Sequence, residues 1–285
     1  MDAIITEDEV QAAIKRCKRG KAAGPDRLGN DWYKDHSEQL LPILTALFSK
    51  WMDAGIFPRS FLQGHIFSIK KKGDPTDPLN YRPIALLNSD YKALTKILTK
   101  RVRTRIGSLV HGTQFGFVPG RGIHTAIKLF EAAKKVGNSS EQYANAQVLL
   151  MDFAKAYDTL DRQFLLAVLK AKGFPPKFIQ MVDATHSDTS AIFLANGYPS
   201  EPISVTRGIR QGCPLAPLLF ILAVDLLYDE LDFTTGECGL DLVGLQGSFR
   251  LHVAGYADDT AIYIREKPCK AESTQLSGDF RKFRG

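Results

Sequence analysis

The segment Gly255-Tyr256-Ala257-Asp258-Asp259-Thr260 places two adjacent carboxylates between two short apolar runs. The flanking residues, 253–254 and 261–264, are mostly β-branched, aromatic or small and apolar, which favours strands. We therefore predict a hairpin with Asp258 and Asp259 at its tip. Two carboxylates this close raise each other's pKa unless a cation lies between them, and clusters of oxygen ligands suit Mg²⁺. For this pair taken alone, a solvated Asp-Asp turn is the alternative.

A second apolar run ends in a third carboxylate. Residues 147–152, with the sequence Gln-Val-Leu-Leu-Met-Asp, fit a buried central strand that carries Asp152 at its carboxyl end. Three acids on a strand end and a neighbouring hairpin can hold two metal ions about 3.5–4 Å apart, which clamp the attacking and leaving oxygens of phosphoryl transfer. Taken alone, Asp152 fits the N-cap of a helix just as well.

A third segment, residues 207–220, combines two arginines and Gln211 with a predicted helix start. Gly212 permits a tight turn, and Pro214 fits the first turn of a helix that continues through residues 218–224. The arginines and the glutamine would then stand at the start of a buried helix, where anions and bases can be bound. An ordinary capped core helix explains the same residues.

Together with three further segments, these motifs resemble the reverse transcriptase domain of non-LTR retrotransposons. The further segments are residues 21–26 (KAAGPD), residues 69–74 (IKKKGD) with 80–87 (NYRPIALL), and residues 114–121 (QFGFVPGR). Tyr-x-Asp-Asp alone is a weak signal, whereas six segments in the family's order, spread over nearly the whole chain, are a strong one. Group II intron proteins share much of this pattern and are the nearest relatives to exclude.

The resemblance implies an α/β (α+β) fold with the fingers and palm of a right-hand polymerase and a mostly antiparallel palm sheet. It assigns residues 1–90 to N-terminal helices and a fingers hairpin, and residues 91–285 to the palm with interleaved fingers segments. A helical thumb follows in the family, whereas only residues 265–285 follow the aspartate hairpin here. We therefore expect the thumb to be missing and the chain to be a fragment or a decayed copy.

The implied activity is that of an RNA-directed DNA polymerase, which extends a DNA primer on an RNA template with dNTP substrates. By resemblance, Asp152 and Asp258 would bind two Mg²⁺ (or Mn²⁺) ions, and Asp259 would complete the acidic site. The implied nucleotide-binding residues are Lys70, Arg82, Phe153, Tyr157 and Gln211. Lys70 and Arg82 would contact the triphosphate, although the sequence does not decide between Lys70, Lys71 and Lys72. Tyr157, often Phe in relatives, would exclude a 2′-hydroxyl.

A basic surface is expected to hold the nucleic acid. The chain has a net charge of +6 and a pI near 9.0, which favours an anionic partner. Lys92, Lys96, Lys100 and Arg103 recur at helical spacing and would line one helix face, although a solvated face is an equal alternative. The candidate nucleic-acid contacts are Lys96, Lys100, Arg103, Arg121 and Arg210.

Other patterns narrow the class of protein. The four cysteines show no CxxC spacing, so neither a zinc site nor a disulfide framework is expected, and a reducing, intracellular compartment is the default. No apolar run approaches about 20 residues, so no membrane span is expected. Residues 6–9 form a capping box that opens a helix ending near Gly20. Residues 65–69 and 84–87 are candidate paired strands.

Two rival functions remain. The first is a polymerase-like fold that binds nucleic acid without polymerising. The second is an RNA-dependent RNA polymerase, which commonly carries Gly-Asp-Asp where this chain has Ala-Asp-Asp and a smaller residue where it has Tyr157. A translated pseudogene without a role is a separate, third possibility.

Overall fold

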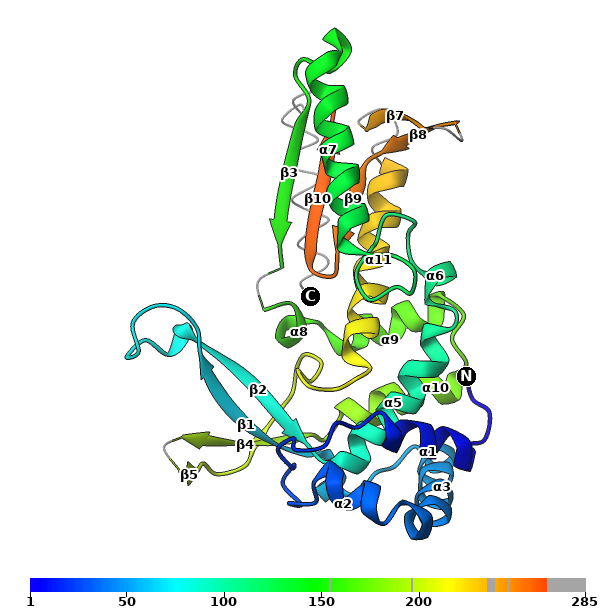
Figure 1. Ribbon diagram of the computed structural model, residues 1–285, viewed down its shortest axis with the longest axis vertical. Coiled ribbons are helices and arrows are strands. Elements are labelled where there is room, and N and C mark those ends of the chain that lie inside the picture. Colours follow the sequence, from blue (N-terminus) through cyan, green and yellow to red (C-terminus); the bar gives the residue numbers. More distant parts are fainter. Residues whose placement is uncertain (154, 196, 235–238, 245–246, 266–285) are drawn as a thin grey trace. The chain divides into compact units, whose positions relative to one another are not determined.

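The computed structural model describes residues 1–153, 155–195, 197–234, 239–244 and 247–265. Two compact units divide the chain (Figure 1), and each is built from two separate stretches. The first unit comprises Met1–Val102 and Leu169–Ala216, and the second comprises Arg103–Val168 and Pro217–Gly285. Helices and sheets with antiparallel strand pairs occur in both units, which confirms the predicted α/β (α+β) class.

The first unit joins helices to a five-stranded sheet. Its helices are α1 (Glu7–Lys15), α2 (Asn30–Asp35), α3 (Ser37–Ala54), α4 (Arg59–Leu62), α5 (Ser89–Arg103, whose last residue is assigned to the second unit) and α10 (Pro176–His186), with a 3₁₀ turn at Pro78–Asn80. Its strands are β1 (Gln63–Lys70), β2 (Tyr81–Leu87), β4 (Ser190–Ala195), β5 (Tyr198–Pro199) and β6 (Ile203–Ser204). Strand β1 pairs antiparallel with β2, as predicted, and parallel with β4.

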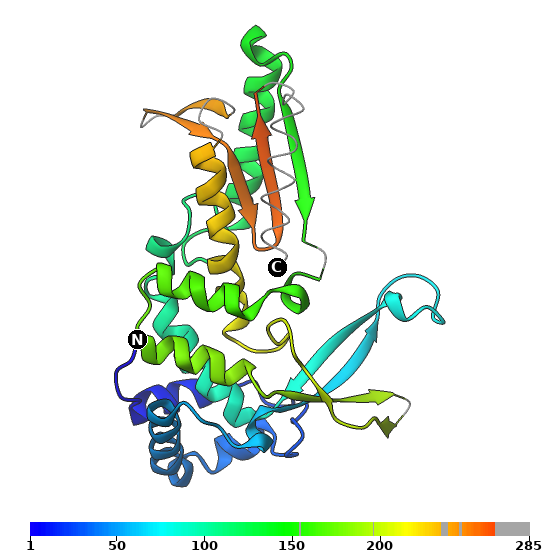
Figure 2. The ribbon, with the colours of Figure 1, turned by 180° about the vertical axis from the view of Figure 1, so that it is seen from behind.

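The second unit contains a three-stranded antiparallel sheet in the order β3-β10-β9. Figure 2 shows these strands side by side from behind. The strands are β3 (Gln147–Asp152), β9 (Val253–Tyr256) and β10 (Asp259–Ile264), and a separate pair consists of β7 (Leu240–Gly244) and β8 (Gly247–Leu251). The helices are α6 (Ile106–Leu109), α7 (Ile123–Ser139), α8 (Ala156–Thr159) and α11 (Ala216–Thr234), with a 3₁₀ turn at Glu141–Tyr143. Helix α9 (Arg162–Ala171) crosses the boundary between the units.

Helices α7 and α11 pack against this sheet. Apolar side chains of α7, including Leu129, Phe130 and Ala133, pack in one core cluster with Ala254 of β9 and Tyr263 of β10. The hydroxyl of Tyr228 on α11 lies 3.1 Å from Thr260 Oγ1 of β10. The core of the second unit therefore supports strands β9 and β10, which flank the aspartate hairpin.

Strand β3 differs from its predicted environment. The apolar run 147–152 predicts a buried central strand, but β3 pairs only with β10 among the described strands, and Leu150 is 68% exposed. The prediction of a strand was right and the prediction of burial was wrong. A short apolar run is compatible with a strand, whereas its position in the sheet depends on which segments pair with it.

The amino-terminal helix begins as the sequence predicts. Thr6 Oγ1 accepts a hydrogen bond from the Glu9 amide at 3.3 Å, and Glu9 Oε2 accepts one from the Thr6 amide at 3.2 Å. Helix α1 ends at Lys15, before the predicted end near Gly20. Among the described helices, none is long and apolar enough to cross a membrane.

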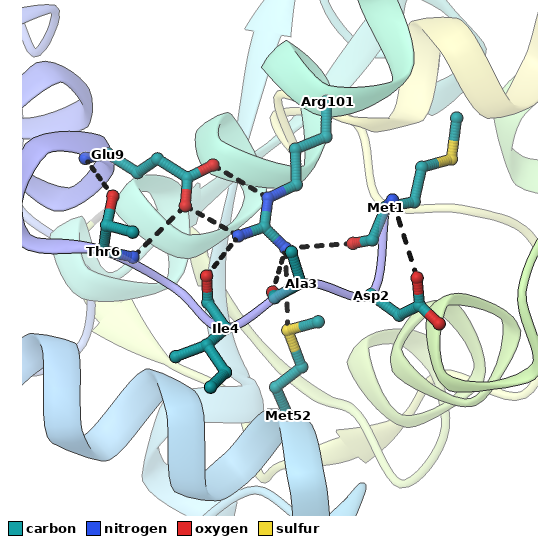
Figure 3. A network of polar contacts seen from close by, with 8 residues as sticks. All are labelled: Met1, Asp2, Ala3, Ile4, Thr6, Glu9, Met52 and Arg101. Atoms are coloured by element: carbon teal, nitrogen blue, oxygen red, sulfur yellow. Dashed lines mark hydrogen bonds and ion pairs between the residues drawn. The ribbon is translucent and has the colours of Figure 1, made fainter.

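Arg101 of α5 holds the amino-terminal residues 1–9 against the rest of the first unit (Figure 3). Its guanidinium donates to both oxygens of Glu9, at 2.8 and 2.6 Å, and to the carbonyls of Met1, Ala3 and Ile4. Burial alone would raise the pKa of Glu9, but hydrogen bonds from Arg101 and from the Thr6 amide outweigh it and hold that pKa below its ordinary value.

We expect Arg101→Met to lower the free energy of unfolding by about 2 kcal/mol, less than for a fully buried pair because Glu9 keeps some solvent contact. Urea titration measures this loss. Arg103→Met, on the exposed part of the same helix, should change stability by less than about 0.5 kcal/mol. Because the folded pKa of Glu9 is lowered, the stabilisation is complete above pH 4.5 and fades as the pH falls through the folded pKa. Equal losses in the two variants at pH 7 would contradict this assignment.

Candidate active site

The two adjacent aspartates lie at the tip of a tight hairpin, as predicted. Tyr256 of β9 pairs with Asp259 of β10, which leaves Ala257 and Asp258 as the two turn residues. Ala257 has a φ of +61°, in the left-handed region that tight hairpin turns use and that glycine occupies more easily. Asp258 is partly buried and Asp259 is exposed.

Asp152 lies directly opposite Asp259 on the neighbouring strand. The two residues are register partners in the antiparallel pair of β3 and β10. Directly paired residues project from the same face of a sheet, with Cβ atoms about 4.5–5.5 Å apart. The pKa of Asp259 is raised, first by the partial desolvation that remains at this exposed position and then by the negative charges of Asp258 and Asp152. The three carboxylates therefore share one end of the sheet, and the charges of Asp152 and Asp258 act on Asp259.

The donor set fits a hard divalent cation, because carboxylate oxygens are the ligands that Mg²⁺ and Mn²⁺ prefer. The arrangement of side chains is less complete. Within the described ranges, no group of three or more His, Cys, Asp or Glu side chains is assembled closely enough to hold a metal ion. The backbone thus brings the three acids to one edge, without gathering their oxygens around one point.

Two aromatic residues follow Asp152 and pack on one buried ring. The ring of Tyr157, in α8, lies 5.2 Å from that of Phe220 in α11, and the ring of Phe153 lies 6.0 Å from it in an edge-on contact. Burial and then the charge of Asp258 raise the pKa of Tyr157 to about 12. Tyr157 therefore lies within electrostatic reach of the aspartate hairpin. Sequence reasoning did not assign Phe220 a role, because one aromatic residue in an apolar helix carries no distinguishing signal.

The β1–β2 ribbon of the first unit carries the predicted triphosphate contacts. Lys70 pairs with Tyr81, Ile69 pairs with Arg82, and the Lys71 amide donates to the carbonyl of Asn80 at 2.7 Å. Because side chains alternate along a strand, this register puts Lys70 on the face opposite Arg82. Lys71 follows the last residue of β1, and its amide bond to Asn80 continues the pairing by one residue. All three cations are exposed.

The loop that contains Gln211 lies against the same ribbon. The carbonyl of Gln211 accepts a hydrogen bond from the amide of Ala85 in β2 at 3.2 Å. Gly212 has a φ of +113°, and a Cβ atom there would come within 2.6 Å of the Ala85 carbonyl oxygen. Glycine thus permits the close approach that holds Gln211 three residues along β2 from Arg82.

Several predicted nucleic-acid contacts are engaged within the protein. Arg210 is only 7% exposed, donates to the carbonyls of Leu62 and Ser190, and lies over the ring of Tyr91 at 5.4 Å. Arg121 donates to the carbonyls of Gly107, His111 and Gln114. The surroundings of Arg210 thus match those of an ordinary capped core helix better than those of a surface that binds nucleic acid.

The basic side chains of α5 differ in their exposure. Lys96 is partly buried, and its Nζ lies 2.9 Å from Cys17 Sγ, whereas Lys100 and Arg103 are exposed. Of the five candidate nucleic-acid contacts, Lys100 and Arg103 thus have the most accessible side chains. Cys17 and Cys213 are free thiols. Cys238 and Cys269 lie outside the described residues.

A model of the family "Reverse transcriptase (RNA-dependent DNA polymerase)" matches residues 69–277. Similar proteins include the "Transposon TX1 uncharacterized 149 kDa protein" of Xenopus laevis, 28% identical over 92% of this chain and 20% of that protein. The RNA-directed DNA polymerase from mobile element jockey of Drosophila melanogaster is 28% identical over 95% of this chain and 29% of its own length. The R2DM polyprotein of the same fly is 26% identical over 92% and 23%. The chain thus spans less than a third of each of these relatives.

Solved structures with a similar fold include telomerase from Candida tropicalis. The apo enzyme, truncated from its C-terminal domain, aligns with a TM-score of 0.54 and 11% identity over 86% of this chain and 53% of that chain. Telomerase in complex with a fragment of telomeric RNA aligns with a TM-score of 0.55 and 12% identity over 85% and 43%. At this identity the likeness concerns the fold, and it confirms the prediction of a polymerase fingers-and-palm fold.

Proposed function

This chain belongs to the reverse transcriptase (RNA-dependent DNA polymerase) family, its relatives are reverse transcriptases of non-LTR retrotransposons, and on that premise we propose that it polymerises DNA on an RNA template. The second unit would be the palm and the first the fingers. One observation carries the proposal: Asp152, Asp258 and Asp259 lie at the same end of the β3-β10-β9 sheet.

Asp152 and Asp258 would hold two Mg²⁺ or Mn²⁺ ions, with Asp259 completing the acidic site. When bound, such ions lower the pKa of the primer 3′-hydroxyl and neutralise charge on the departing pyrophosphate. The 3′-hydroxyl would lose its proton to water, and its oxygen would form a bond to the α-phosphorus of the dNTP while the bond to the bridging oxygen of the pyrophosphate breaks. The carboxylates fix where this happens, because the turn and the β3–β10 register fix their backbones.

Arg82 would grip the triphosphate of the incoming nucleotide, since its planar guanidinium can donate to two phosphate oxygens at once. We infer that Lys71 is its partner, because the register puts Lys70 on the face opposite Arg82 and the bond of the Lys71 amide to Asn80 continues the pairing by one residue. Gln211 would contact the nucleotide or the template beside it. Lys100 and Arg103 would contact the phosphate backbone of the hybrid, where binding weakens with salt.

We expect Lys71→Ala to raise the KM for dNTP about tenfold with little change in kcat, because it would remove a charge that contacts the triphosphate before and during the reaction. Lys70→Ala is the matched control and should change KM less than about twofold. Steady-state addition of one nucleotide measures both. The reverse order of the two effects would reassign the contact to Lys70.

The experiment that tests the function is single-nucleotide addition to a DNA primer on an RNA template, with the protein in excess and Mg²⁺ or Mn²⁺ present. We expect one or a few nucleotides to be added from dNTPs. Addition from rNTPs alone would identify an RNA polymerase. Salt-sensitive binding of the primer–template without addition would identify a nucleic-acid-binding remnant. The remnant is the second candidate, and the incomplete grouping of metal ligands in the described residues favours it.

A further inference from the structure

None of the substrate contacts of the proposed function involves the motif at residues 114–121. Its first residues run beside strand β9 toward the aspartate hairpin. The Gly255 amide donates to the Thr113 carbonyl at 3.0 Å, and the Phe115 amide donates to the Gly255 carbonyl at 2.8 Å. Gln114 and Gly255 form a parallel bridge. The motif thus extends the palm sheet at the strand that leads into the catalytic turn.

The side chain of Gln114 reaches the turn itself. It is 1% exposed, and its Oε1 accepts hydrogen bonds from the amides of Ala257, at 3.0 Å, and Gly116, at 2.8 Å. Its Nε2 donates to the Ala257 carbonyl and the Tyr228 hydroxyl, both at 3.4 Å. One buried amide group therefore binds both the N–H and the C=O of the turn residue that precedes Asp258.

The turn needs such support. A left-handed conformation costs a residue with a Cβ atom about 1–2 kcal/mol, and Ala257 adopts it. Strained conformations persist where the surrounding structure enforces them, and they cluster at functional sites. Gly116 allows the contact, because a Cβ atom there would lie 2.2 Å from the Ala257 nitrogen.

The last residue of the motif supports the first. Arg121 Nη1 donates to the carbonyls of His111, at 2.6 Å, and Gln114, at 2.9 Å. The arginine thereby fixes the backbone from which the Gln114 side chain projects. Its role in the motif is to organise this segment.

We propose that Gln114 is a positioning residue that sets the place of Asp258 by holding both backbone polar groups of Ala257. The inference rests on the proposed polymerase function, since it assigns Asp258 to the reacting centre. A misplacement of about 1 Å at such a centre can cost about a hundredfold in rate. Gln114 touches neither nucleotide nor metal in this assignment, so its loss should act on kcat rather than on dNTP binding.

The test compares Gln114→Met, which keeps the length of the side chain but has no amide group, with Gln114→Glu, which keeps the acceptor oxygen. Gln163→Met, on the exposed side of α9, is the matched control. Hydrogen exchange of the Ala257 and Gly116 amides is the direct readout. The Tyr263 amide, bonded to the His252 carbonyl, is the internal reference for global unfolding. Single-nucleotide addition gives kcat and the KM for dNTP.

In Gln114→Met we expect the Ala257 and Gly116 amides to exchange about tenfold faster or more, with Tyr263 unchanged. The kcat should fall about 10- to 100-fold with KM within twofold. Gln114→Glu should keep the amide protection, and Gln163→Met should match the wild type. Unchanged Ala257 exchange in Gln114→Met, or a wild-type kcat, overturns the proposal. If the wild type adds no nucleotide, the polymerase function fails, and hydrogen exchange alone decides whether Gln114 holds the turn.

Discussion

Asp258→Asn should reduce single-nucleotide addition by about a thousandfold or more. The substitution removes a negative charge from the site proposed to hold two divalent cations, and a thousandfold corresponds to about 4 kcal/mol of transition-state stabilisation. Rates of addition with saturating dNTP measure the loss. Glu131→Gln, at an exposed position of α7 in the same unit, is the control and should leave the rate unchanged.

The same variant gives a readout that does not depend on catalysis. Mg²⁺ or Mn²⁺ should raise the melting temperature of the wild type, because a ligand that binds only the folded state stabilises it. Asp258→Asn should weaken this effect. It should also lower the pKa of Asp259, since the charge of Asp258 is one of the causes that raise it. A full metal response and an unchanged Asp259 titration in the variant would rule out a shared site.

Tyr157→Val should lower the preference for dNTP over rNTP about 10- to 100-fold. In the proposed role the ring excludes the 2′-hydroxyl sterically, and overpacking of this kind costs about 1–3 kcal/mol. Competition between dNTP and rNTP in single additions measures the ratio. Tyr157→Phe keeps the ring on Phe220 and should retain the preference. If valine leaves sugar choice unchanged, Tyr157 is a core aromatic and the gate is elsewhere.

The sequence predicted features well where they depend on neighbouring residues. The aspartate hairpin and the capping box at Thr6 depend on residues a few positions apart, and the structure contains both. The pairing of Asp152 with Asp259 joins residues far apart in the chain, so strand patterns could not predict it, and the family resemblance implied only that these acids share one site.

Other features depended on surroundings that the sequence does not reveal. Arg210 was expected to meet nucleic acid, but a helix start fits a buried arginine equally well, and the structure buries it. The position of Lys70 on the face opposite Arg82 follows only from the register of β1 against β2. The support of the turn by Gln114 likewise depends on a contact across more than a hundred residues.

The division of the chain bears on how it folds during synthesis. The first 102 residues form a unit with residues 169–216, so strand β1 lacks its parallel partner β4 until the later stretch has been made. Because ribosomes add about 5–20 residues per second, that delay is on the order of ten seconds. During this interval one edge of β1 is unpaired, and open strand edges promote aggregation. Slower translation or chaperone binding over this interval should therefore affect the yield of soluble protein more than the same change near the carboxyl end.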